Sequence, residues 1–199
     1  MDCSHSSYNK FKALKTAIPK IFDYLFYNAD DMWKLLYYIE PSQYPLLSES
    51  VAVDKKAAMI CNSPQDYYDA DIVTKKNFLF QKFSDDSFDV AVPQIRMWVD
   101  DYRALNSYQG YANICFQIVV PNKQCQFLNG DTTTADRALE LTLALVDALN
   151  GQEIPDADLH SPLFLNRQAP DGAGRNTGAV REKENTNYNG YILTFSVLV

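Results

Sequence analysis

The stretch from Ile118 to Gly151 constrains the fold of this chain more than any other. It begins with apolar residues, turns at Pro121-Asn122, returns through 124–128, and continues with apolar residues at three- and four-residue steps. This order predicts a strand, a hairpin and then a helix over about residues 134–149. The apolar face of that helix is broad enough to lie on a sheet, and it consists of Ala138, Leu139, Thr142, Leu145, Val146 and Leu149.

The ends of this helix are predicted by its flanking residues. Either Thr133 or Thr134 can cap the first turn through its hydroxyl oxygen. Asp136 and Glu140 lie near the positive end of the helix dipole. Gly151 follows the last turn, where a glycine tolerates the left-handed backbone that ends many helices. None of these residues is chemically reactive, so the helix is expected to have a structural role.

Helical patterns also occupy the N-terminal part of the chain. Residues 8–27 keep an apolar stripe, and Pro19 either kinks that helix or begins a second one. The sequence Asn-Ala-Asp-Asp at 28–31 predicts a stop and a fresh cap, followed by a short helix that ends at Glu40-Pro41. Residues 41–75 are rich in proline and small polar residues, which predicts mostly loop with one short helix around 53–59.

Apolar residues of period two predict the strands. The expected strands are 78–83, 94–100, 111–120, 163–165 and 188–199, with a turn at 84–87 and a polar link at 100–109. Residues 168–187 contain no large hydrophobe except Val180, so this segment is predicted to be a flexible loop or arm. The predicted fold is α+β: an antiparallel sheet of about four to five strands, covered by the long helix and the N-terminal helices.

Length and charge limit the classes of function. A chain of 199 residues, 47% of them hydrophobic, is expected to form a single domain over 1–199. A net charge of −7 argues against a protein that grips nucleic-acid phosphates. No apolar run approaches the roughly 18–20 residues of a membrane helix, so a protein soluble in the cytoplasm is expected. The four cysteines form no C-x-x-C pair, which favours free thiols over disulfides or a metal site.

The chain offers little for catalysis. His5 and His160 have no Cys, Ser or acidic partner at a motif spacing. The run at 172–175 lacks the Gly-Lys-Ser/Thr ending of a phosphate loop. Asp66, Asp69 and Asp71 could offer oxygen ligands to a hard cation, but the group lacks the glycine and terminal glutamate of a calcium loop. We therefore predict no catalytic residues, no cofactor, no metal and no enzymatic activity.

The order of these features resembles that of the small neck proteins of tailed bacteriophages, especially the tail terminator and tail-completion group. After an N-terminal helix, the resemblance is carried by four stretches in order: D-D-M-W-K-L-L-Y-Y at 30–38, I-C-F-Q-I-V-V at 114–120, the helix end L-V-D-A-L-N-G, and Y-N-G-Y-I-L-T-F at 188–195. It covers most of the chain.

The resemblance implies a structural virion protein that forms a closed ring, commonly a homo-hexamer, at the head–tail junction. Such a ring caps the tail tube, docks the head-side connector, has the sheath as a further neighbour, and leaves a channel through which DNA passes without specific binding. It is assembled in the host cytoplasm. We expect no membrane partner, and the candidate assembly contacts are Pro121, Asn122, Lys123, Trp98, Arg175, Val180 and Arg181.

Three other hypotheses for the function remain beside the tail terminator. The nearest is another ring of the same neck, such as a head-completion or connector protein. A small soluble module that binds a protein partner belongs to a different class. An enzyme comes third, because the chain lacks a credible nucleophile, base or metal site.

Overall fold

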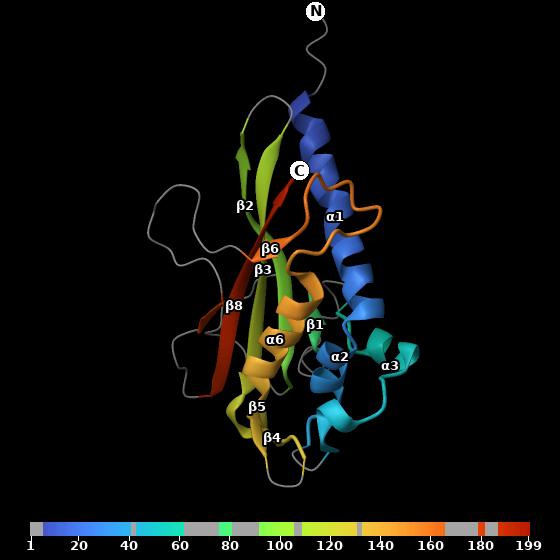
Figure 1. The fold of residues 1–199 in the computed structure, drawn as a ribbon, viewed down its shortest axis with the longest axis vertical. Helices are drawn as coiled ribbons and strands as arrows, with labels where there is room; N and C mark the ends of the chain where they lie inside the picture. The colour runs from blue at the N-terminus through green and yellow to red at the C-terminus, as the bar shows by residue number, and fades with distance from the viewer. Residues whose placement is uncertain are drawn as a thin grey trace, which may run out of the picture.

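A computed structural model describes residues 6–40, 43–61, 76–80, 92–105, 109–130, 133–165, 179–181 and 187–199. Its helices are α1 (Ser6–Asn28), α2 (Asp30–Tyr37), α3 (Val53–Ala58) and α6 (Arg137–Leu149), with short 3-10 turns η2 (Pro45–Leu47) and η4 (Asn122–Gln124). Its strands are β1 (Phe78–Leu79), β2 (Gln94–Ala104), β3 (Gly110–Pro121), β4 (Gln126–Leu128), β5 (Thr134–Asp136), β6 (Phe164–Leu165), β7 (Ala179–Arg181) and β8 (Tyr188–Leu198). The helices lie against one side of the sheet, which confirms the α+β fold (Figure 1).

The main sheet has the strand order β1-β2-β3-β8-β6, and β7 also pairs with β8. The long strands β2, β3 and β8 are antiparallel, as expected. The expectation of an antiparallel sheet was wrong for β1, which runs parallel to β2. Residues 80–93 join these two strands, and a connection of that length is enough for the crossover that parallel neighbours require.

The two central strands supply the floor of the core. The inward row of β3 is fully buried, as its alternation predicted: Ala112, Ile114, Phe116, Ile118 and Val120. From β8, the core receives Leu193, Phe195 and Val197, and Val199 follows just after the strand. The rings of Phe116 and Phe195 meet edge to face with their centroids 5.7 Å apart. These rows explain why the period-two pattern located both strands.

The N-terminal helices α1 and α2 pack against this same core. The predicted helix over 8–27 is confirmed, and α1 continues through Pro19, which therefore begins no second helix. α2 buries Met32, Leu35 and Leu36, but its N-cap residue is Ala29, without a side-chain hydrogen bond. The prediction of a polar cap at this junction was wrong. The short helix expected around residues 53–59 is present as α3.

The chain after β3 departs most from the sequence prediction. Residues 124–128 were expected to return along β3 as a hairpin, but the strand within them, β4, pairs with β5 in a separate two-stranded sheet. The physical reason is that both edges of β3 are already occupied, one by β2 and the other by β8. The turn η4 therefore leads the chain away from the main sheet rather than back into it.

Two further features differ from the prediction. β2 runs on to Ala104, with a bulge between Val99 and Asp101, so part of the expected polar link is strand. Part of the expected loop over 168–187 is also a strand, because β7 pairs with the edge of β8. An exposed row of backbone groups on β8 favours such pairing, even for a polar segment. The rest of that loop, except Asn187, lies outside the described residues, as do 81–83 of the first predicted strand.

Candidate assembly surfaces

Asp136 determines where α6 begins. Its carboxylate accepts hydrogen bonds from the backbone nitrogens of Ala138 at 2.9 Å and Leu139 at 3.4 Å. The predicted caps were wrong, because Thr134 belongs to β5 and the helix starts at Arg137. At the other end, Gly151 has the positive φ of 78° expected just past a helix. Both ends of α6 are therefore fixed.

Arg137, the first residue of α6, is fully buried. Its guanidinium donates only to backbone carbonyls: Nε to Gln124 at 2.8 Å, Nη1 to Leu35 at 2.6 Å and Tyr38 at 3.0 Å, and Nη2 to Ile39 at 3.4 Å. Three of these carbonyls lie at the end of α2, where a helix has unpaired oxygens and a partial negative charge. Arg137 therefore fastens the start of α6 to the end of α2 and to η4.

Burial lowers the pKa of Arg137 to about 10. That value is still well above neutral pH, so the side chain carries its charge into the interior. The guanidinium also lies 5.0 Å from the ring centroid of Phe127 in β4, which adds a cation–π contact. All of its described partners are carbonyls or a ring, so its role is structural and it offers no group for catalysis.

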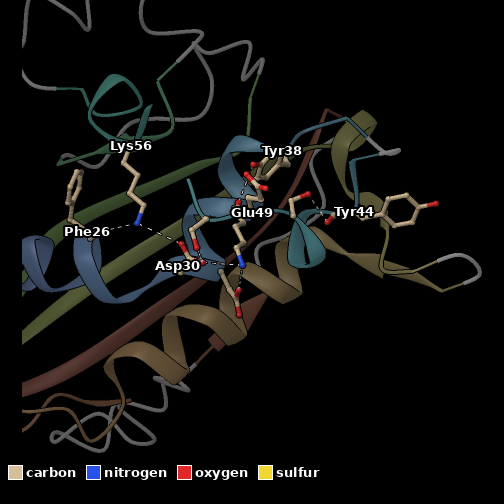
Figure 2. A network of polar contacts seen from close by, with 10 residues as sticks. Phe26, Asp30, Tyr38, Tyr44, Glu49 and Lys56 are labelled. Carbon is tan, nitrogen blue, oxygen red and sulfur yellow. Dashed lines mark hydrogen bonds and ion pairs between the residues drawn. The ribbon is translucent and has the colours of Figure 1, made fainter. Parts of the chain in front are cut away.

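A second polar network joins α1, α2 and α3, and Figure 2 shows it from close by. Asp30 accepts a hydrogen bond from Ser50 at 2.8 Å and forms an ion pair with Lys34 at 3.0 Å. Lys56 of α3 donates to the carbonyl of Phe26 at 3.2 Å, and its ammonium lies 3.9 Å from Asp30. The network ties the loop before α3 to the junction between the first two helices.

The charges in this network stabilise one another. Burial would raise the pKa of Asp30, but the hydrogen bond from Ser50 and the contacts with Lys34 outweigh it, so the pKa lies below its ordinary value of 3.8. Burial would likewise lower the pKa of Lys34, yet Asp30 and Asp31 raise it above 10.5. Each charged group has neighbours that form hydrogen bonds or ion pairs with it, so the network stabilises the fold.

The outward side of α6 carries exposed leucines. Leu139 and Leu143 lie one turn apart and expose 41% and 47% of their surface. The sequence pattern predicted that Leu139 lies on the buried face, and this prediction was wrong. It also omitted Leu141, which is fully buried. The missed signal was the composition of R-A-L-E-L-T-L-A-L-V-D-A-L, whose apolar residues are too numerous to fit on one face of the helix. We call Leu139 and Leu143 the leucine stripe.

The opposite face of the main sheet points away from the helices, and one half of it is closed. Arg96 donates to Gln117 at 3.1 Å and to Gln94 at 3.2 Å across β2 and β3. Gln94, Arg96 and Gln117 are each no more than 3% exposed. This half is a buried polar layer and offers no surface to a partner.

The other half of that face is open. Its rim is aromatic: Trp98 of β2 is half-buried, Tyr111 of β3 is 38% exposed, and Phe164 of β6 is 52% exposed. Between them lie the small polar side chains of Asn113, Thr194 and Ser196, which are half-buried. The register places Trp98 beside Cys115 and Thr194, and Phe164 beside Ser196 and Asn113. We call these six residues, Trp98, Tyr111, Asn113, Phe164, Thr194 and Ser196, the aromatic platform.

The candidate contacts from the sequence do not form one surface. Asn122 and Lys123 are exposed in η4, and Pro121 is buried at the end of β3. Trp98 lies on the aromatic platform, where it pairs with Cys115, six residues along β3 from Pro121. Six residues of strand span about 20 Å.

Three further candidates lie elsewhere in the chain. The backbones of Val180 and Arg181 pair with β8, next to Ile192 and Tyr191. Arg175 lies outside the described residues. Among the six described candidates, only neighbours in the chain lie together: Pro121, Asn122 and Lys123 in one place, and Val180 and Arg181 in another.

The described part of the chain holds no group of three or more His, Cys, Asp and Glu side chains that could bind a metal. His160 is exposed, and its backbone nitrogen donates to the carbonyl of Leu198. Cys61, Cys115 and Cys125 are free thiols, as expected. His5 and the aspartates at 66, 69 and 71 lie outside the described residues. Among the residues described, no helix has the length and apolar content to cross a membrane.

No protein-family model, curated protein or solved structure matches this chain. Its function is therefore inferred from the surfaces described above and from the order of its elements.

Proposed function

We propose that this protein is a structural subunit of the neck of a tailed bacteriophage, most closely the tail terminator. It acts by assembling into a ring that caps the tail tube, meets the head-side connector and leaves a channel for DNA. The observation that carries the proposal is the leucine stripe, because α6 exposes two leucines on the side that faces away from its own core. The order of helices and strands that resembles the neck proteins supplies the identity of the ring.

The leucine stripe favours a protein that functions in an assembly. α6 has only three charged residues, Arg137, Glu140 and Asp147, and the first of these is buried. A surface helix normally places charged and polar residues along its outer side, so exposed leucines on that side favour contact with another protein. Exposed leucines one turn apart are a common contact for another protein.

A closed ring also needs two different surfaces on each subunit, because its contacts run head to tail. The leucine stripe and the aromatic platform satisfy this requirement, since they lie on opposite sides of the main sheet. The net charge of −7 suits a channel that lets DNA slide without gripping it. A ring whose lumen proved strongly positive would contradict this part of the proposal.

The purified protein provides the direct test. Mass measurement in solution together with negative-stain micrographs should show a discrete ring with a central hole. A strict monomer at high concentration would argue against the ring and favour the small binding module, which would use the same leucine stripe on a different protein. An antibody can then separate the two neck positions. Labelling at the head-proximal end of isolated tails supports the terminator, and labelling of isolated heads supports a head-completion or connector protein.

A further inference from the structure

We infer that residues 52–58, which carry α3, form a lid that lifts from the folded protein and uncovers the rings of Phe26 and Trp33. Lys56 is the latch that keeps this lid closed. The inference does not rest on the proposed ring, because the lid and the rings beneath it belong to one chain.

The lid has little that holds it down. Lys56 is 7% exposed, whereas every other side chain of residues 52–58 is exposed, including the apolar Val53 at 61%. α3 has only six residues, and its N-cap Ala52 makes no side-chain hydrogen bond. A helix this short has little stability of its own. At its far end, the Ala58 carbonyl accepts one exposed hydrogen bond, from Lys76 at 3.0 Å.

The two points where the lid joins the core are fixed. Val51 before it and Met59 after it are 5% and 6% exposed, and both belong to the main core. The carbonyl of Met59 also accepts hydrogen bonds from the backbone nitrogens of Asn77 at 2.9 Å and Phe78 at 3.0 Å. Movement is therefore confined to the residues between these two anchors.

The latch consists of contacts that are each weak. Figure 2 shows the Lys56 side chain reaching from α3 towards the carbonyl of Phe26, at 3.2 Å, and towards Asp30, at 3.9 Å. Its ammonium lies 5.9 Å from the ring centroid of Phe26 and 6.0 Å from that of Trp33. Asp30 is 36% exposed, so water screens the ion pair. Segments that bury few apolar side chains open with the lowest free energies, and the lid meets this condition.

The lid closes one end of a cluster of aromatic rings. Trp33 is fully buried, and its ring meets that of Phe26 edge to face at 5.6 Å. From Phe26 the contacts continue to Phe22 at 5.9 Å and from Phe22 to Phe80 at 4.8 Å. Phe80 is 39% exposed, so the cluster already reaches solvent at its other end. Lifting the lid enlarges this aromatic surface, and Lys56 thereby controls how much of it is exposed.

Labelling of the native protein with an amine-reactive reagent tests whether the lid lifts. Lys55 is exposed and serves as the internal control, because it should react as fast as in the urea-unfolded chain. Lys56 should react about 10- to 100-fold more slowly than in the unfolded chain. This protection should still be at least about 100-fold smaller than the unfolding equilibrium constant obtained from urea curves. Protection equal to that constant would overturn the lid, and a Lys56 as reactive as Lys55 would overturn the latch.

Two carboxylate variants test the latch itself. Asp30→Asn removes the ion pair with Lys56 and should accelerate labelling of Lys56 about two- to fivefold, without changing the rate at Lys55. Asp31→Asn is the matched control, because that carboxylate pairs with Lys34 and should leave the labelling of Lys56 unchanged. Equal rates at Lys56 in the two variants would overturn the role of Asp30 in the latch.

Fluorescence of Trp33 tests what the lid covers. The chain has two tryptophans, so Trp98→Phe leaves Trp33 as the only reporter. In that background, Lys56→Ala should at least about double the quenching of Trp33 by acrylamide, whereas Lys55→Ala should leave it unchanged. Circular dichroism spectra check that each variant is folded. If Lys56→Ala does not fold, Asp30→Asn in the same background gives the readout, and unchanged quenching in the folded variant overturns the uncovering of Trp33.

These outcomes are separate from those of the proposed ring. A protein that stays monomeric but labels and quenches as expected keeps the lid and loses the ring. A protein that forms rings while Lys56 reacts only on complete unfolding keeps the ring and loses the lid.

Discussion

At the scale of single residues, Arg137 is the side chain that the sequence could least reveal. An arginine in the first turn of a helix is normally solvated, and nothing nearby in the sequence indicates that it is buried. Its main partners, the carbonyls of Leu35 and Tyr38, lie about a hundred positions earlier in the chain. A contact of that separation leaves no periodic pattern, so only the folded structure shows that this charge links two helices.

Replacing Arg137 by methionine should lower the free energy of unfolding by about 3 kcal/mol. The methionine fills part of the space, but the carbonyls at the end of α2 lose their donors and remain buried. Urea unfolding of the wild type and the variant measures the difference. Arg103→Met removes an exposed arginine from β2 and should change the free energy by no more than about 0.5 kcal/mol. Equal effects of the two substitutions would mean that the buried hydrogen bonds of Arg137 are unimportant.

Asp30 should make stability depend on pH in acid. Its pKa is lowered in the folded protein, so its contribution is complete above 3.8 and is lost as the pH falls through the folded pKa. Asp30→Asn should therefore destabilise the protein at pH 7, by less than about 1 kcal/mol because the side chain is partly exposed. In strong acid, the wild type and the variant should be equally stable.

Unfolding curves at neutral and acidic pH test the Asp30 prediction. The control is Asp31→Asn, because that carboxylate is 63% exposed and lies 3.6 Å from Lys34. It should have the smaller effect at pH 7. A difference between the wild type and Asp30→Asn that stayed constant into strong acid would contradict the proposed role of the carboxylate charge.

At the scale of elements, the sequence predicted what local periodicity determines. The buried rows of β3 and β8 and the existence of α2, α3 and α6 all follow from spacing within one segment. The parallel placement of β1 and the pairing of β4 with β5 were not predicted. Both depend on which strand edges remain free once the others have paired, and that is a property of the whole sheet.

The start of α6 gives a direct test at this scale. Asp136→Ala should lower the free energy of unfolding by about 1 kcal/mol, because two backbone N–H groups of the first turn lose their acceptor. Thr134→Ala, at one of the two positions that the sequence offered as a cap, should have an effect below about 0.5 kcal/mol because this residue is exposed in β5. Thermal unfolding of both variants decides between them, and the reverse order would restore the threonine cap.

At the scale of the whole molecule, the described helices and the main sheet share one core. Most of the buried apolar residues from Leu14 in α1 to Val199 after β8 belong to a single cluster, and Trp33 lies within it, fully buried. Leu25 accepts a hydrogen bond from the Trp33 indole at 3.0 Å, which fixes α2 against α1. A continuous core of this kind predicts that the helices do not unfold independently of the sheet.

Unfolding should therefore be a single cooperative transition. Tryptophan fluorescence reports on Trp33 in the helical layer and on Trp98 in the sheet, and far-ultraviolet circular dichroism reports on secondary structure as a whole. The two signals should change at the same urea concentration. A fluorescence change well separated from the loss of secondary structure would mean that the helical layer and the sheet are distinct folding units.

The position of β8 has a consequence for how cells make this protein. Of all the strands it is the last to leave the ribosome, yet it lies inside the sheet, between β3 on one edge and β6 and β7 on the other. Until residues 188–198 have been translated, β3 keeps one unpaired edge and the sheet lacks its second row of core side chains. A nascent chain in that state exposes an apolar strand that other nascent chains can join. A premature stop before β8 would therefore yield aggregates rather than a smaller folded protein.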